Sequence, residues 1–267
     1  MTATAIMFNG TAFALAADGN QLLDRGRDMP ITALGETNSA QKIFPFETRN
    51  IVCACILCGD VVSEDRKFDA AVELKRHLAA VAHIGVKTPR ELVANFGAAL
   101  SDHIEHLIAI RQLKLWPALQ IPFVGFCGAD AFYLTLYINR YRASTGLHYE
   151  LVGQVVDKWL FSYTGSPVIA ELMQKADSRI PHCIRVPSET PISLQEAVEV
   201  AQGYITACSS PLGRELDPEW APGLGGHIHV ATVMPVYRPS WWARQFQCAK
   251  PTGGFAWVLP PQNLSQL

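Results

Sequence analysis

The sequence lacks a hydrophobic run long enough to cross a membrane. Its apolar stretches, such as 52–57 and 132–138, are far shorter than the roughly 20 residues that a membrane-spanning helix needs. It also lacks an excess of either charge, because 22 Lys and Arg oppose 24 Asp and Glu and leave a net charge of −2. The chain therefore offers no electrostatic footprint for nucleic acid or for anionic lipid, and we expect neither nucleic acid nor a membrane as a partner.

Several catalytic signatures are missing as well: a Gly-rich phosphate-binding loop, a His-Glu-x-x-His helix and a Gly-x-Ser-x-Gly turn. The first residues lack the positive charge that opens a signal peptide, so we interpret them as mature sequence. The seven cysteines are an odd number, and Cys53, Cys55 and Cys58 fall in an apolar, strand-like run. This pattern favours buried free thiols and a cytoplasmic location over a zinc site, which would need a second Cys or His pair.

The composition of the 267 residues, 49% hydrophobic and 17% charged, is that of one globular domain with a sizeable core. Hydrophobic periodicity and turn residues predict strands, then two helices, strands, two helices and a last strand. This order favours an α+β fold with two sheets between helical layers over an alternating βαβ fold. The strands are predicted over 3–8, 12–17, 42–46, 50–58, 120–127, 131–138, 155–163 and 227–234, and the helices over 63–81, 89–111, 166–175 and 193–209.

Six short pieces, in order along the chain, carry a family resemblance. They are Thr2, Ala16-Ala17-Asp18-Gly19, Gln41-Lys42-Ile43, Cys58-Gly59-Asp60, Tyr163-Thr164-Gly165-Ser166-Pro167 and Gly225-Gly226-His227-Ile228-His229-Val230. In these pieces the chain resembles proteasome β-subunits and bacterial proteasome-like peptidases, which are N-terminal-nucleophile (Ntn) hydrolases. The resemblance implies a four-layer αββα sandwich over residues 2–234. The Pro- and Trp-rich residues 235–267 would be an extension packed on the body or on a neighbouring subunit.

The resemblance also assigns roles. Thr2, exposed when Met1 is removed, would be the nucleophile, and its own α-amino group, with a reference pKa of about 7.7–8.0, would be the base. Lys42 would lower the pKa of both groups, Asp18 would hold Lys42, and the Gly59 N–H would bind the oxyanion. This chemistry requires no metal or organic cofactor.

The remaining supporting positions depart from the family pattern. Thr164 takes the place of a supporting Ser. The signature Asp-x-x-Ser-Gly-Gly reads Ala221-Pro222-Gly223-Leu224-Gly225-Gly226, so Leu224 replaces its Ser and the nearest Asp is the displaced Asp217. We include Thr164 and Asp217 among the candidate site residues.

The implied function is a threonine peptidase subunit of a homo-oligomeric ring, acting on peptides or unfolded proteins, with an ATP-dependent unfoldase as a further possible partner. Two alternatives stay open at this point. One is an Ntn amidohydrolase acting on a small amide. The other is a catalytically silent assembly subunit that keeps Met1.

Other residues have competing interpretations. Thr4 is a second, weaker candidate nucleophile. His103 and His106 lie at i, i+3 on a predicted helix, a spacing that would suit a metal face and is typical of an exposed helix face. His227 and His229 share one face of a predicted strand, and we interpret them as structural or interface residues.

Overall fold

The computed structural model describes residues 2–19, 40–59, 68–139, 148–156, 158–180, 192–220, 224–237 and 252–261. Within these ranges the strands form two antiparallel sheets. The first sheet contains β1 (Thr4–Phe8), β2 (Phe13–Asp18), β9 (Leu160–Thr164), β10 (Ile228–Tyr237) and β11 (Thr252–Leu259), in the order β11-β10-β2-β1-β9. The second contains β3 (Ile43–Glu47), β4 (Ile51–Ile56), β5 (Cys58–Gly59), β6 (Leu119–Cys127), β7 (Asp130–Ile138) and β8 (Tyr149–Gln154), in the order β3-β4-β6-β7-β8, with β5 also paired to β6.

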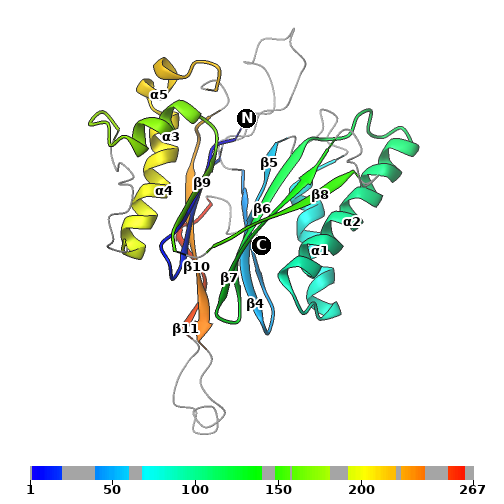
Figure 1. The fold of residues 1–267 in the computed structure, drawn as a ribbon. Coiled ribbons are helices and arrows are strands. Elements are labelled where there is room, and N and C mark those ends of the chain that lie inside the picture. Colours follow the sequence, from blue (N-terminus) through cyan, green and yellow to red (C-terminus); the bar gives the residue numbers. More distant parts are fainter. Residues whose placement is uncertain are drawn as a thin grey trace, which may run out of the picture.

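Helices cover the outer face of each sheet (Figure 1). The second sheet is covered by α1 (Ala70–Ile84) and α2 (Pro89–Ala109). The first is covered by α4 (Leu194–Ser209), against which α3 (Pro167–Gln174) and α5 (Pro211–Leu216) pack on the same side. The inner faces of the sheets meet where β10 contacts β4 and β6. The order of layers is therefore helix, sheet, sheet, helix, which confirms the predicted α+β sandwich of αββα type.

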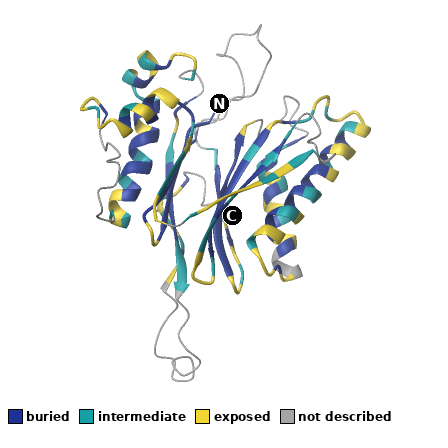
Figure 2. Ribbon diagram, in the orientation of Figure 1, coloured by how far each residue is buried: buried dark blue, intermediate teal, exposed yellow. Residues whose placement is uncertain are grey.

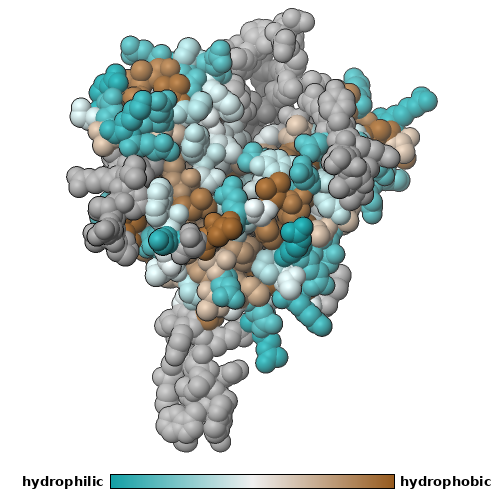
Figure 3. All heavy atoms as spheres, in the orientation of Figure 1, coloured by the Kyte–Doolittle hydropathy of each residue, from teal (hydrophilic) through white to brown (hydrophobic). Residues whose placement is uncertain are grey.

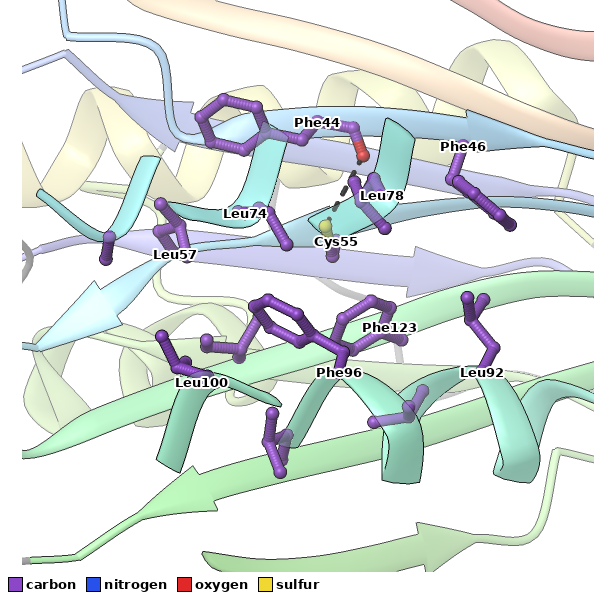
Figure 4. Close-up of a cluster of buried hydrophobic side chains, with 14 of the residues drawn as sticks. Phe44, Phe46, Cys55, Leu57, Leu74, Leu78, Leu92, Phe96, Leu100 and Phe123 are labelled. Carbon is purple, nitrogen blue, oxygen red and sulfur yellow. Dashed lines mark hydrogen bonds between the residues drawn. The ribbon is translucent and has the colours of Figure 1, made fainter. Parts of the chain in front are cut away.

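Buried residues form a cluster in each of the three spaces between layers, and Figure 2 shows buried positions along both sheets and on the helices that cover them. Phe96 and Leu100 of α2 belong to the buried cluster between α1, α2 and the second sheet (Figure 4), and Phe96 packs edge-on against Phe123 with ring centroids 6.0 Å apart. Phe13 packs against Phe126 between the sheets, with ring centroids 5.5 Å apart. All residues of β1 and β2 are buried because a sheet lies on one side of them and α4 on the other. This explains why these strands are continuous apolar runs rather than alternating ones.

Local signals fix where the long helices begin. The Asp69 side chain accepts a hydrogen bond from the Ala71 N–H (2.8 Å) at the start of α1. Ser193 and Glu196 form a capping box at the start of α4, where each side chain accepts a hydrogen bond from the other residue's N–H. Such caps satisfy N–H groups that have no partner within the helix, so they set the helix boundaries.

Three elements were not predicted from the sequence. Most residues of β8 are exposed at the edge of its sheet, so its apolar pattern is weak. Helix α5, with six residues, is too short to show a period. Strand β11 lies in the Pro- and Trp-rich segment 235–267, for which no periodicity was apparent. It pairs with β10 through an irregular register that includes Gly254, a residue with φ of +104°.

The face drawn in Figure 3 carries hydrophobic side chains near its centre among hydrophilic ones. Large apolar residues with exposed side chains include Val152, Val155, Trp159 and Tyr163, which belong to or adjoin the edge strands β8 and β9. Within the described ranges, none of the helices is long and apolar enough to span a membrane.

Candidate active site

The site is built around a buried ion pair between Asp18 and Lys42. Asp18 is the last residue of β2, and Lys42 directly precedes β3 in the other sheet. Lys42 Nζ lies 2.7 Å from Asp18 Oδ1, and the two side chains are 4% and 0% exposed. A charged Lys is rarely buried without a partner, and the carboxylate of Asp18 meets that need. The pair therefore connects the two sheets at one end of the sandwich.

Asp18 also holds the beginning of the described chain. The Ala3 N–H donates to Asp18 Oδ1 (3.0 Å), and the Asp18 N–H donates back to the Ala3 carbonyl (3.1 Å). The other carboxylate oxygen, Oδ2, accepts from the Gly225 N–H (3.2 Å). One oxygen of Asp18 thus receives both the ammonium of Lys42 and the amide that directly follows Thr2.

Opposing effects act on the pKa of Asp18. Burial raises the pKa above its usual value, whereas the Lys42 ammonium and the hydrogen bonds from Lys42, Ala3 and Gly225 lower it. These donors stabilise the carboxylate in a place where an isolated charge would be expensive. The ion pair and the hydrogen bonds from the Ala3 and Gly225 amides therefore depend on one another.

Thr2 lies in this region and is itself buried, with 7% of its surface exposed. Its carbonyl accepts a hydrogen bond from Thr164 Oγ1 (3.3 Å), and Thr164 Oγ1 also lies 2.8 Å from Thr4 Oγ1. Thr4 and Thr164 are directly opposed in the pairing of β1 with β9. Thr164 therefore contacts Thr2 through its backbone, while the hydroxyl of Thr4 is engaged with Thr164.

The thiol of Cys58 lies next to the hydroxyls of Thr4 and Thr164. The Sγ of Cys58 is 3.8 Å from Thr164 Oγ1 and 3.9 Å from Thr4 Oγ1. Burial raises the pKa of Cys58 to about 11. The thiol is therefore neutral at physiological pH and a weak nucleophile there.

Gly59 follows Cys58 and ends β5, where it pairs with Leu119 of β6. Its φ is +100°, and a Cβ at this position would lie 2.1 Å from the Ala118 carbonyl oxygen. Both the backbone conformation and the neighbouring chain therefore require glycine here. Its predicted neighbour in the motif, Asp60, lies outside the described residues.

Asp217 is engaged elsewhere. Its carboxylate accepts from the Ser166 hydroxyl (2.6 Å), and Ser166 in turn caps α3 by accepting from the Ile169 N–H (3.1 Å). Tyr204 links this network to the site because its hydroxyl donates to the carbonyls of both Thr164 and Ser166 (3.2 and 3.1 Å). Asp217 therefore reaches the Thr2 region only through other residues.

Two contributors to the site were not recognised in the sequence. The Gly225 N–H binds Asp18, and His229 accepts a hydrogen bond from the Lys42 backbone N–H at Nε2 (3.2 Å). Both residues fall in the segment 225–230, which carries part of the family resemblance. That resemblance is the sequence signal by which they could have been found. Leu224, which replaces the family's Ser, is 3% exposed and belongs to the core under α4, while positions 221–223 lie outside the described residues.

No metal centre is apparent in this part of the chain. Among the described residues, no group of three or more His, Cys, Asp or Glu is placed to hold a metal ion. His103, considered above for a metal face, lies 3.3 Å from a carboxylate oxygen of Glu73, which joins α2 to α1.

No protein-family model matches the chain, and no curated protein matches its sequence. Among solved structures, it is similar to Anbu (ancestral beta-subunit) from Yersinia bercovieri, with a TM-score of 0.52 and 11% identity over 87% of this chain and 81% of that one. The fold is that of a proteasome-like subunit. A second match is the Anbu (Gly-1) mutant from Hyphomicrobium sp. strain MC1, with a TM-score of 0.51 and 12% identity over 87% and 80% of the two chains. At these identities the likeness concerns the fold alone.

Proposed function

We propose that the protein is a threonine-type peptidase whose nucleophile is Thr2, exposed by removal of Met1. The observation that carries the proposal is the buried Asp18–Lys42 ion pair, because the same Asp18 oxygen also binds the Ala3 amide directly after Thr2. This shared oxygen, in a fold of proteasome-like type, supports a role for the Lys42 ammonium in activating Thr2. A hydroxyl needs such activation, since it is a weak nucleophile at its ordinary pKa.

The proposed reaction has two halves. Thr2 Oγ1 attacks the carbonyl carbon of the scissile peptide bond, and the free α-amino group of Thr2 takes the hydroxyl proton. The tetrahedral intermediate collapses, the C–N bond breaks, and the same proton passes to the leaving amine, which leaves an ester on Thr2. Water then attacks the ester, gives one proton back to Thr2 Oγ1 through the amine, and releases the carboxylic acid.

The other candidate residues would support this reaction. Lys42 would lower the pKa of the amine and the hydroxyl by its charge, and Asp18 would keep Lys42 in place. The Gly59 N–H would donate to the oxyanion. Thr164 would orient Thr2 by its bond to the Thr2 carbonyl, and Asp217 would act at a distance by holding Ser166 at the start of α3.

The proteasome-like fold supports the assembly part of the proposal. We infer a homo-oligomeric ring that encloses the sites, peptides or unfolded proteins as substrates, and a cytoplasmic setting in which an ATP-dependent unfoldase delivers them. A sizing experiment tests this part. A ring elutes at several times the mass of the chain, whereas an amidohydrolase for small amides has no need of a chamber.

The catalytic part is tested by Thr2→Ala and its matched control Thr2→Ser, assayed with a panel of fluorogenic peptides. We expect Thr2→Ala to abolish turnover and Thr2→Ser to keep a measurable share of it, because Ser retains both the hydroxyl and the amine. Intact-mass measurement of the purified protein should show that Met1 is absent. Retained Met1 would leave no free amine on Thr2 and would favour the catalytically silent subunit.

A further inference from the structure

His229 lies on β10 in the first sheet and is completely buried, with 0% of its surface exposed. It stands opposite Ala17 of β2, one residue before Asp18. Its Nε2 accepts a hydrogen bond from the backbone N–H of Lys42 (3.2 Å). Because Lys42 precedes a strand of the second sheet, this bond crosses from one sheet to the other beside the ion pair.

The backbone of Lys42 is thus held on two sides. Its carbonyl accepts from the Leu57 N–H (3.0 Å) within the second sheet, and its N–H donates to His229 in the first. The side chain of Lys42 extends from this backbone, and its ammonium pairs with Asp18, which is also in the first sheet. The position of the ammonium therefore depends on how the two sheets are fixed at this residue.

The hydrogen bond from Lys42 fixes the tautomer of the imidazole. Since Nε2 accepts from the Lys42 N–H, the neutral ring carries its proton on Nδ1. Of the two ring nitrogens, Nε2 is therefore the one that can hold the backbone of Lys42.

We propose that His229 is a positioning residue for the reaction, which fixes Lys42 against Asp18 by accepting the hydrogen bond of its backbone N–H. The inference rests on the proposed function, in which Lys42 activates Thr2. His229 acts through Lys42 and does not itself touch the reacting atoms.

The protonation state of His229 is consistent with this role. Burial, first, and then the charges of Lys42 and His227 lower the pKa of His229 to about 3. The ring is therefore neutral near pH 7 and keeps its acceptor. A second positive charge beside Lys42 would both remove that acceptor and repel the ammonium.

The test separates the acceptor from the ring. His229→Phe keeps an aromatic ring near Trp257, which packs edge-on against His229 at 6.3 Å between centroids, but it lacks the acceptor. His229→Gln loses the ring and keeps an oxygen that can accept. His227→Phe is the matched control, because His227 lies two residues earlier and its Nε2 is 2.8 Å from the carbonyl oxygen of Pro260.

Peptide turnover and the rate of Lys42 acetylation are measured on full-length, assembled variants whose Tm equals that of the parent protein. We expect His229→Phe to lower kcat by about 10- to 100-fold with little change in KM, because a small displacement of Lys42 is enough. Acetylation of Lys42 by acetic anhydride, followed by mass spectrometry, should become about 2- to 10-fold faster, as expected for the loss of one hydrogen bond. His229→Gln should recover most of both values, and His227→Phe should match the parent.

The outcomes distinguish the two proposals. Parental kcat and Lys42 acetylation in His229→Phe, while Thr2→Ala is inactive, would overturn the role of His229 and leave the peptidase proposal in place. Failure of His229→Phe to fold would assign His229 a structural role and would also overturn the inference. Full turnover in Thr2→Ala would end the peptidase proposal, whereas faster acetylation of Lys42 in His229→Phe would still support the positioning contact.

Discussion

Replacement of Lys42 by Met removes the ammonium 2.7 Å from Asp18 and keeps an apolar, unbranched stem. Asp18, 0% exposed, is then left with the two amide donors of Ala3 and Gly225. Removing one partner of a buried ion pair costs about 3–5 kcal/mol. In a domain of this size each kcal/mol corresponds to roughly 2–4 °C, so we expect Tm at pH 7.5 to fall by about 6–20 °C.

The size of this loss should depend on pH in a definite direction. Burial already raises the pKa of Asp18, and the charge of Lys42 is the largest effect that opposes burial, so the pKa rises further in Lys42→Met. A carboxyl whose pKa is higher in the folded than in the unfolded state stabilises the fold while protonated, and this stability is lost as the pH rises through the folded pKa. The variant should therefore lose less Tm at pH 5 than at pH 7.5.

Calorimetry at both pH values measures this difference, with peptide turnover recorded on the same samples. We expect turnover to fall by more than about 100-fold, the usual scale for losing a group that assists proton transfer. The exposed Lys87 supplies the control, since Lys87→Met should change neither value. An equal Tm decrease at pH 5 and pH 7.5, or no decrease at all, would refute the reasoning that Asp18 holds a buried charge against Lys42.

Two further substitutions test the surroundings of the site. Gly59→Ala adds a Cβ that would lie 2.1 Å from the Ala118 carbonyl oxygen at a φ of +100°, so calorimetry should show a larger loss of Tm than for Gly128→Ala, where φ is +65° and the space is open. Tyr204→Phe removes the donor to the carbonyls of Thr164 and Ser166 and should lower the free energy of unfolding by about 1–3 kcal/mol in urea titrations, whereas exposed Tyr163→Phe should have no effect. Equal losses within either pair would contradict the corresponding contact.

Much of the fold could be predicted from local patterns in the sequence. Asn9-Gly10 between two apolar runs is a local signal for the hairpin of β1 and β2, and Ser193 followed three residues later by Glu196 is a local signal for the start of α4. The elements that escaped prediction are held by their neighbours instead. β11 contains two glycines with positive φ and forms because β10 offers it a strand to pair with, a partner that lies outside any local window.

The sequence by itself determined which residue types were available to the site and where each lay along the chain, because strand and helix signals are local. The resemblance to proteasome-like Ntn hydrolases singled out Asp18 and Lys42, and their catalytic role stays a prediction. Only the tertiary structure decided how they meet. The Asp18 oxygens also accept hydrogen bonds from the Ala3 and Gly225 amides, and the Lys42 N–H donates to His229. Such contacts span up to about 200 residues of sequence and follow from the packing of two sheets, which no spacing along the chain encodes.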